Sequence, residues 1–398
     1  MSRMHLREII GKPLTGEWGN EDLTGTGVPV LRTTNFTNDG IISFDNVVTR
    51  DISPNRLNDK WLKHGDIIIE KSGGSDRQPV GRVVYYVGEN NAYTFNNFTS
   101  ALRVQDQSHW NPKFVFYALF YNYAIGGTRK YENKTTGLHN LKLNLFVDKF
   151  AINWISVSEQ NRIVAVIDAI THLISLRQRQ AEKLDELVKA RFVEMFGDPV
   201  RNTKQFPLVE LQDLYDVSSS KRVYQDEMVL NGIPFLRISD IVEKSTNDKC
   251  TPQCFISQEM YDQLSQKGLT PNVGDILVTS RGTLGLCYEV KPGEKFYFQD
   301  GMISWLYNRK DCVINTYLLY AFRMPGIRKQ IDGSNDGSTV SYLSIARLKR
   351  LKIELPPLAL QTEFSHFVHE VDREKERIQR SAALLETLKR SLMQQYFG

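Results

Sequence analysis

The sequence predicts an α+β protein built from two copies of one domain, each followed by a long helix, with the two helices forming an antiparallel coiled coil. Three observations predict it: motifs that return in the same order about 200 residues later, mixed β-type and helical segments in each copy, and two stretches with heptad-like apolar spacing. The expected boundaries are 1–156 and 198–357 for the domains, and 157–197 and 358–398 for the helices.

The repeat rests on short matches that keep a constant order along the chain. They are Val28-Pro-Val-Leu-Arg32 with Ile233-Pro-Phe-Leu-Arg237, Gly65-Asp-Ile-Ile68 with Gly274-Asp-Ile-Leu277, Gly81 with Gly285, and Met195-Phe-Gly197 with Tyr396-Phe-Gly398. A solenoid would need more and shorter units, so two matches indicate a tandem pair of globular halves.

Each half begins with a mixed region. β-type runs such as 66–70 and 81–87 are separated by turns rich in Gly, Asn and Ser. Helical segments are expected around 112–123 and 316–323, before the long helices. This order of elements predicts the α+β class.

The first long helix is expected at about 158–196, and the second follows Pro356-Pro357. In both, apolar residues recur at steps of three and four with polar interruptions, which is typical of a coiled-coil seam. The residues expected to pair the helices are Ile163, Ile167, Ile170, Ile174, Leu184, Val188, Phe367, Val371, Ile378, Leu385, Leu388 and Leu392.

A helix with such an apolar stripe needs a partner, and the simplest partner is the other long helix. A helix of about 38 residues is roughly 57 Å long, enough to hold two domains in separate segments of a DNA groove. The alternative is an interface helix of an ordinary dimeric protein. Two matched helices, each closing a repeated domain, favour a spacer.

Composition sets wide bounds on function. The net charge of +4 at pH 7 is compatible with a nucleic-acid partner without requiring one. The start of the sequence lacks a signal peptide and no stretch of about 18 apolar residues occurs, so we expect a cytoplasmic protein without a membrane partner. Cys250 and Cys254 have a loose ligand-like spacing, but no second pair follows, which favours free thiols and no bound metal.

The sequence carries no recognisable catalytic motif. It lacks a phosphate-binding loop, an Asn-Pro-Pro-Tyr run, Gly-x-Ser-x-Gly and His-Glu-x-x-His. Asp275 before Glu289-Val-Lys291 has a spacing that could bind Mg²⁺ in a nuclease. Asp66 is the counterpart of Asp275 and has no such partner, so a turn aspartate explains both copies better.

Reading a DNA sequence requires forked donors and amides at base edges, with cations and hydroxyls at phosphates. Polar loops at matched positions offer these groups in both halves. The candidates in the first half are Arg32, Thr33, Thr34, Asn35, Lys71, Ser72, Ser75, Arg77, Arg129, Lys130, Lys134 and Thr135. Those in the second half are Arg237, Ser239, Arg281, Thr283, Lys329, Ser338 and Thr339.

Each of these loops taken singly is as well explained as a solvated loop. Arg32 and Arg237 could equally anchor a strand end to a carboxylate. The interpretation gains weight because the same loops recur with different side chains, as two readers of different sequences would require.

The chain resembles, over its whole length, the specificity subunit of type I restriction–modification systems. The resemblance is carried by the paired Pro-x-Leu-Arg segments, the paired Gly-Asp-Ile turns, Gly337-Ser-Thr339 leading to Leu355-Pro-Pro357, and the two Phe-Gly ends. Leu355-Pro-Pro-Leu-Ala-Leu-Gln361 and Ser158-Glu-Gln160 are similar to the segments that open this family's spacer helices. Asn153-Trp-Ile155 departs from the Leu-Pro-Pro of the pattern, which blurs the start of the first helix.

The resemblance implies a non-catalytic subunit that binds a bipartite, asymmetric target in double-stranded DNA. Each target-recognition domain would read one part, and the helices would fix the gap. Two modification subunits carrying S-adenosylmethionine would methylate adenines, and two ATP- and Mg²⁺-dependent restriction subunits can join them. No cofactor is expected on this chain. The alternatives are a self-sufficient Mg²⁺-dependent nuclease or DNA methyltransferase, and a coiled-coil adaptor that never touches DNA.

Overall fold

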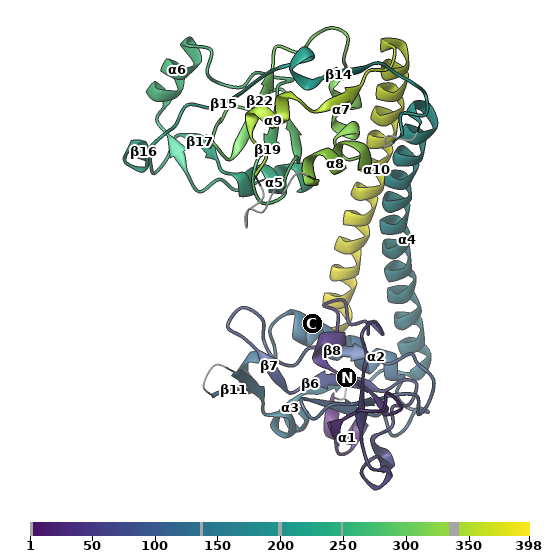
Figure 1. Cartoon of the computed structure of the whole chain (residues 1–398). Helices are drawn as coiled ribbons and strands as arrows, with labels where there is room; N and C mark the ends of the chain where they lie inside the picture. Colours follow the sequence, from purple (N-terminus) through teal and green to yellow (C-terminus); the bar gives the residue numbers. More distant parts are fainter. Residues whose placement is uncertain (1–2, 136–137, 198–200, 248–249, 334–341) are drawn as a thin grey trace. The chain divides into compact units, whose positions relative to one another are not determined.

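The computed structural model describes residues 3–135, 138–197, 201–247, 250–333 and 342–398. It contains two compact units, one of Met1–Gln178 with Gln379–Gly398 and one of Arg179–Ile378. Each unit therefore contains one α+β domain together with a part of both long helices (Figure 1).

The first unit has an antiparallel central sheet. Its strand order is β2 (Leu14–Thr15), β10 (Thr99–Leu102), β6 (Ile67–Glu70), β8 (Val83–Tyr85). A second sheet has the order β3 (Asn20–Glu21), β5 (Val48–Asp51), β4 (Val28–Leu31), β9 (Thr94–Phe95), with β9 parallel to β4. Smaller sheets pair β1 (Arg3–His5) with β13 (Ala151–Asn153) and place β12 (Leu138–Leu141) between β11 (Glu132–Thr135) and β7 (Ser72–Gly74).

The helices of this domain are short. They are α1 (Leu6–Ile10), α2 (Pro112–Ala124) and α3 (Leu143–Lys149), with 3-10 turns η1 (Thr33–Asn35), η2 (Pro54–Arg56), η3 (Asn58–Lys60) and η4 (Arg129–Tyr131). The predicted strands at 66–70 and 81–87 and the predicted helix at 112–123 are confirmed by β6, β8 and α2.

The second unit repeats this plan. Its central sheet has the order β15 (Asp216–Ser219), β22 (Ile303–Tyr307), β19 (Ile276–Thr279), β20 (Cys287–Glu289). A second sheet has the order β16 (Met228–Val229), β18 (Phe255–Ile256), β17 (Ile233–Leu236), β21 (Tyr297–Phe298), again with one parallel pair, β17 with β21. β14 (Leu208–Glu210) pairs with β23 (Lys352–Glu354).

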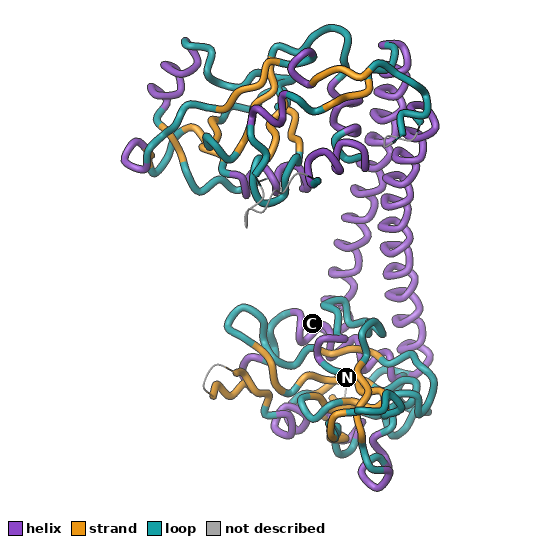
Figure 2. Tube along the Cα trace, viewed as in Figure 1, coloured by secondary structure: helices purple, strands orange, loops and turns teal. Residues whose placement is uncertain are grey.

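The helices of the second domain are α5 (Ile238–Asn247), α6 (Gln258–Gln266), α7 (Asn315–Ala321), α8 (Pro325–Asp332) and α9 (Ile345–Lys349), with η5 (Leu211–Asp213) and η6 (Gln225–Glu227). α7 confirms the helix predicted around 316–323. In the tube view, the strands of each unit lie together and the long helices run beside them (Figure 2). The predicted duplication is thus present as two copies of the same sheet orders.

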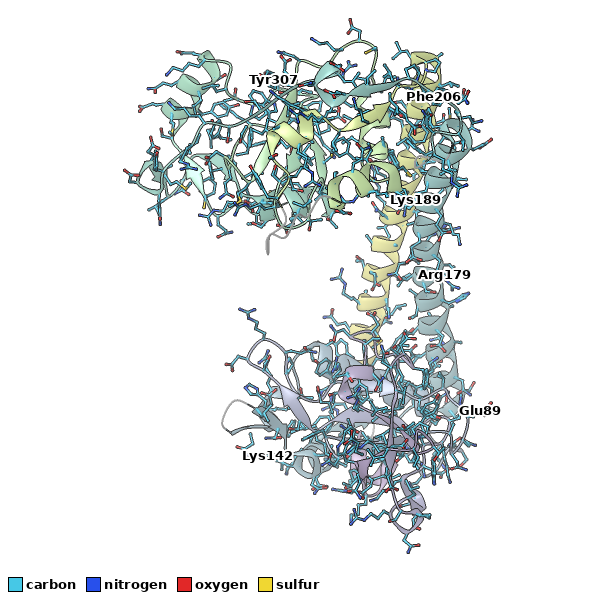
Figure 3. All side chains as sticks on the ribbon, viewed as in Figure 1. Glu89, Lys142, Arg179, Lys189, Phe206 and Tyr307 are labelled. Atoms are coloured by element: carbon cyan, nitrogen blue, oxygen red, sulfur yellow. The ribbon has the colours of Figure 1, made fainter. Side chains whose placement is uncertain are left out.

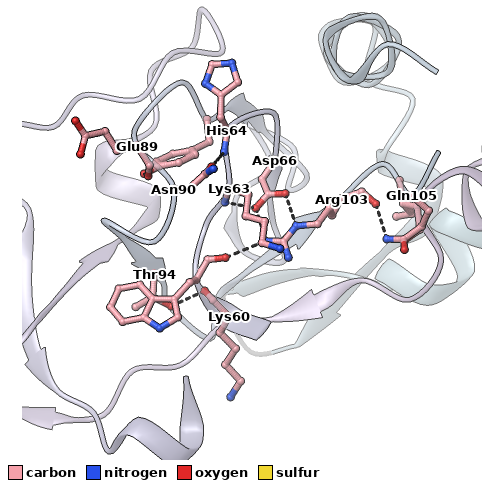
Figure 4. A network of polar contacts seen from close by, with 12 residues as sticks. Lys60, Lys63, His64, Asp66, Glu89, Asn90, Thr94, Arg103 and Gln105 are labelled. Carbon is pink, nitrogen blue, oxygen red and sulfur yellow. Dashed lines mark hydrogen bonds and ion pairs between the residues drawn. The ribbon is translucent and has the colours of Figure 1, made fainter. Parts of the chain in front are cut away.

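A buried aspartate closes the turn before the central strand of the first unit. Asp66 accepts a hydrogen bond from the backbone N–H of Lys63 at 2.8 Å, and Gly65 before it has φ +92°, a conformation that favours glycine. The Arg103 guanidinium donates to both carboxylate oxygens of Asp66, at 2.8 and 2.7 Å (Figure 4). These two hydrogen bonds from Arg103 hold the turn against the neighbouring strand.

The second unit contains the same turn with a different outer partner. Asp275 accepts the N–H of Asn272 at 2.8 Å and the indole N–H of Trp305 at 2.9 Å, and Gly274 has φ +87°. Burial raises the pKa of the Asp275 carboxyl. The interpretation of both aspartates as turn residues is therefore confirmed.

The long helices are α4 (Val157–Phe196) and α10 (Leu358–Phe397). In the second unit, Phe192 of α4 contacts Phe364 of α10 edge to face, with ring centroids 5.4 Å apart. Arg191 Nη2 lies 2.7 Å from Glu363 Oε1, and Lys375 Nζ lies 2.6 Å from Asp185 Oδ1. Late residues of α4 meet early residues of α10, so the helices run antiparallel here.

In the first unit, early residues of α4 meet late residues of α10. Ile163 and Ile167 near the start of α4 share one hydrophobic core with Met393 near the end of α10. Phe397 of α10 contacts Phe114 of α2, with ring centroids 5.1 Å apart. The two helices are again antiparallel.

The residues predicted to pair the helices differ in exposure. Seven are buried: Ile163, Ile167, Ile170, Ile174, Val188, Val371 and Ile378. Leu184, Phe367, Leu385 and Leu392 are half-buried, and Leu388 is 47% exposed. On the last turns of α10 the buried residue is Met393, because it packs into the hydrophobic core of the first domain. Charged residues such as Lys189 project from α4 into solvent (Figure 3).

A buried glutamine at the fourth position of each long helix joins that helix to its domain. The Gln160 amide accepts the N–H of Asn111 at 2.8 Å and donates to the carbonyls of His109 and Ile155 at 3.0 and 2.9 Å. Three neighbouring backbone groups therefore depend on one side chain, which is fully buried.

Gln361 forms the same joint in the second unit. Its amide accepts the N–H of Ile314 at 2.8 Å and donates to the carbonyls of Cys312 and Pro356 at 3.0 and 2.8 Å. The joint precedes α2 in one unit and α7 in the other, so both long helices are attached to their domains in one way.

We predict that Gln361→Leu lowers the stability of the second unit by about 3 kcal/mol, because three backbone groups lose their partner in a buried position. The measurement is urea unfolding together with amide hydrogen exchange at Ile314. Gln266→Leu, an exposed position at the end of α6, is the control and should change stability by less than about 0.5 kcal/mol. Unchanged hydrogen-exchange protection of the Ile314 amide would contradict the role assigned to Gln361.

Candidate DNA interface

In the first unit the structure brings the predicted segments together. The Arg82 guanidinium donates to the carbonyls of Thr33 and Phe36 at 2.9 and 3.0 Å, which holds the segment around η1 next to the start of β8. The Arg129 guanidinium donates to the carbonyl of Asp76 at 3.3 Å. The segments around 33, 76 and 129 therefore form one cluster of polar loops.

The centre of this cluster is a tight turn at residues 75–78, called here the Arg77 turn. The N–H of Ser75 donates to the carbonyl of Gln78 at 2.7 Å, and the N–H of Gln78 donates to Ser75 Oγ at 3.1 Å. A Cβ on Gly74 would lie 2.5 Å from the backbone N of Val80, so only glycine allows the loop to close. Arg77 is exposed on this closed turn. An arginine presented in this way can donate two hydrogen bonds to a guanine edge in the major groove.

Asn35 does not belong to the candidate set, which corrects the sequence-based prediction. Its side chain is 2% exposed, and its amide accepts the N–H of Arg32 at 3.0 Å and donates to the carbonyls of Ser43 and Asp45. An amide with these internal partners has no group to offer to a base. Thr34 is exposed and Thr33 is half-buried, so both remain candidates.

Arg32 is half-buried, and its Nε is buried without a hydrogen-bond partner within the described residues. Arg237, its counterpart, is exposed. In the part of the chain that the structure describes, neither side chain forms an ion pair with a carboxylate. The binding role of these two arginines stays a prediction.

The remaining candidates of the first unit lie in the segments around β7, η4 and β11. Lys71 is half-buried before β7, and burial lowers the pKa of its ammonium group. Ser72 and Ser75 follow it, and exposed Lys130 lies 5.2 Å from the centre of the Tyr131 ring. Lys134 and Thr135 are in β11, and their side chains lie outside the described residues.

Sequence reasoning missed Arg82. It lies 3.6 Å from Glu70, whose carboxyl pKa is raised by burial, and it donates to two carbonyls of the η1 segment. Arg82 follows Gly81 in a motif that the sequence analysis used only to align the repeat. An arginine directly after a repeated glycine was the available signal.

In the second unit, three candidate side chains are exposed after strand ends. Arg237 and Ser239 follow β17, and Thr283 lies in the loop after β19. The N–H of Arg237 donates to Asp240 at 2.7 Å, as Arg32 does to Asn35. The turn is therefore shared by both units while its capping side chain differs.

Arg281 is also exposed, and its guanidinium lies 5.2 Å from the centre of the Tyr342 ring. Lys329 on α8 is exposed and borders a cavity of about 360 Å³ that is also lined by Phe192 and Ile353, so it faces a different set of neighbours. Ser338 and Thr339 lie outside the described residues.

The described residues contain no group of three or more His, Cys, Asp or Glu side chains that could hold a metal ion. Glu289 accepts a hydrogen bond from the Asn315 amide at 2.6 Å, and Asp275 accepts the N–H of Asn272 in its turn. All four cysteines are free thiols, as predicted. Within the described residues, no helix combines the length and apolar character needed to cross a membrane.

The fold therefore consists of two copies of one α+β domain, each with polar loops beside its central sheet and each joined to an antiparallel helix pair. A solved structure from a study of complex assembly and conformational transition of the type I R-M system matches with a TM-score of 0.60 and 16% identity, covering 100% of this chain and 97% of that one. The type I restriction–modification S subunit of M. genitalium matches with a TM-score of 0.56 and 15% identity, covering 100% and 96%.

Residues 204–386 match a model of the family described as "Type I restriction modification DNA specificity domain". A putative type I restriction enzyme specificity subunit of Haemophilus influenzae is 30% identical over 210 residues, which are 52% of this chain and 51% of that protein. The MjaVIII specificity subunit of Methanocaldococcus jannaschii is 20% identical over 293 residues, 66% of each chain. The matches thus span about half to two thirds of these relatives. The chain is thus similar to type I restriction–modification specificity subunits over half to two thirds of their length, and residues 204–386 match the DNA specificity domain of that family.

We predict that Arg77→Ala lowers discrimination at one base pair of the DNA target by about tenfold, the size expected for losing one bidentate contact. The measurement is competition binding between the target duplex and duplexes with single base changes. Arg56→Ala removes another exposed charge elsewhere in the same unit and should leave discrimination unchanged. Equal losses for all sequences would instead assign Arg77 to the DNA backbone.

Proposed function

We propose that the chain is the non-catalytic DNA-specificity subunit of a type I restriction–modification complex and reads a bipartite, asymmetric target in double-stranded DNA. One observation carries the proposal: the second domain matches the family's DNA specificity domain, and the first domain repeats its sheet orders. A duplicated reader with different loop side chains is the arrangement that two different half-sites require.

The loops suit this role chemically. The first unit would read through Arg77 with Lys71, Arg129, Lys130 and Thr34, and the second through Arg237, Ser239, Arg281 and Thr283. Arginine forks distinguish guanine in the major groove, while lysines and hydroxyls contact phosphates and set the register. Binding that uses such cations should weaken steeply as salt is raised.

We further propose that two modification subunits carrying S-adenosylmethionine assemble on this chain and methylate adenines in cytoplasmic DNA. Two ATP- and Mg²⁺-dependent restriction subunits would join them for cleavage. The chain itself would bind none of these cofactors. The family match over residues 204–386 supports this proposal, as does the similarity to a solved structure from a study of type I R-M complex assembly.

The proposal predicts that exchanging residues 200–356 for the matching segment of another family member changes one half of the target only. The exchanged segment contains the second reading domain and leaves the first unit intact. The measurement is the methylated motif in genomic DNA after co-expression with the modification subunit. An unchanged motif would contradict the assignment.

The control for this exchange is the purified chain alone, supplied with Mg²⁺ or S-adenosylmethionine. It should neither cleave nor methylate DNA. Activity without a partner would support the alternative of a self-sufficient enzyme, and absent or salt-insensitive DNA binding by the complex would support an adaptor.

The proposal also predicts that the long helices set the gap between the half-sites. Inserting one heptad after Gln180 in α4 and one after Ser381 in α10, which keeps the pairing in phase, adds about 10 Å of helix. The motif should keep both half-sites and gain about three base pairs between them, at 3.4 Å per base pair. A heptad inserted after Gly25, where the space is open, should leave the gap unchanged. A fixed gap in both variants would refute the spacer role.

A further inference from the structure

A buried acid–imidazole pair lies beside the Arg77 turn. Glu132 Oε2 and His139 Nδ1 are 2.9 Å apart, and the two side chains are only 6% and 8% exposed. Glu132 begins β11 and His139 is in β12, so the pair bridges two neighbouring strands. A carboxylate and an imidazole at such depth are costly unless they bond each other and their surroundings.

The other bonds of the pair reach the loop that contains Arg77. Glu132 Oε1 accepts the N–H of Val80 at 3.0 Å, which fixes the end of the loop. The backbone of His139 is the register partner of Gly74 in β7, so the imidazole lies on the strand beside the start of the loop. His139 Nε2 also lies 3.6 Å from Asp76 Oδ1 within the turn itself. The side chains of the pair therefore meet the loop at its end and at its tip.

The position of this turn matters because an arginine fork reads a base only within narrow geometric limits. A reading side chain must be held within about 0.5 Å of its productive position by groups behind it. Arg77 is exposed, and among the described residues no hydrogen bond or ion pair holds its side chain, so its position depends on the turn that carries it.

The second unit holds its matching loop differently. Ser280 Oγ lies 2.8 Å from Ser304 Oγ, and Arg328 donates to the carbonyl of Leu284 at 2.5 Å. The described part of that loop thus depends on a serine pair and an arginine. A defect in the Glu132–His139 pair should act on the first reader alone.

We propose that Glu132 and His139 are positioning residues that orient the Arg77 turn and thereby determine how strictly the first half of the target is read. This inference rests on the proposed function, since it assigns a role within the same DNA interface. The two residues touch no base themselves; they act through Val80, Asp76 and Arg77.

The experiment compares the genomic methylation motif of the wild-type complex with those of His139→Ala and His139→Leu. Leucine keeps most of the side-chain volume and removes both polar contacts, so it separates lost packing from lost hydrogen bonds. We expect discrimination at one position of the first half to fall by about tenfold in both variants, with the second half unchanged. His139→Asn keeps a donor where Nδ1 lies and should restore the wild-type motif.

The matched control is His109→Ala. His109 Nδ1 also pairs with a carboxylate, that of Asp106 at 2.7 Å, but both side chains are exposed and lie in another loop of the same unit. This variant should keep the complete motif.

Equal discrimination in wild type and both His139 variants would overturn the inference. So would loss of both halves or of all methylation, because the pair would then be required for folding and not for orientation. A wild-type complex that shows no bipartite motif would instead refute the proposed function, and the two failures are thereby distinguished.

Discussion

Two long amphipathic helices cannot keep their apolar faces in water, and the burial of those faces is the constraint on which both units depend. Ile163 and Ile167 complete the core of the first domain, and Phe192 and Phe364 complete that of the second. Each long helix therefore contributes residues to the hydrophobic cores of both domains. The start of each helix is then fixed by a buried glutamine whose loss would leave three backbone groups without partners.

The two units share what is buried and differ in what is exposed. The Gly-Asp turns, the sheet orders and the glutamine joints recur because packing and hydrogen bonding allow few alternatives inside a domain. The exposed side chains of the loops are less constrained, so the first unit presents Arg77 while the second presents Arg281 beside Tyr342. A scaffold of this kind can keep its fold while its loops come to read another sequence.

An exposed arginine does not discriminate between bases unless its position is also fixed. Arg77 is held by a closed turn, and that turn is supported by Gly74 and by the buried Glu132–His139 pair. Arg82 has a related supporting role, because it joins the segment around η1 to the central sheet. Precision at a DNA interface therefore depends on groups that DNA never touches.

The sequence by itself determined the duplication, the α+β order and the two long helices. These follow from local periodicity and from motifs that repeat at a constant distance, and they need no knowledge of contacts. The tertiary structure alone decided which polar residues face outward. Asn35 has an amide side chain of the kind that contacts base edges. In the folded chain this amide accepts the N–H of Arg32 and donates to two carbonyls from the next turn. Glu132 and His139 form a pair only because β11 and β12 are adjacent. Exposure and hydrogen-bond partners depend on residues brought together by folding, which no local pattern records.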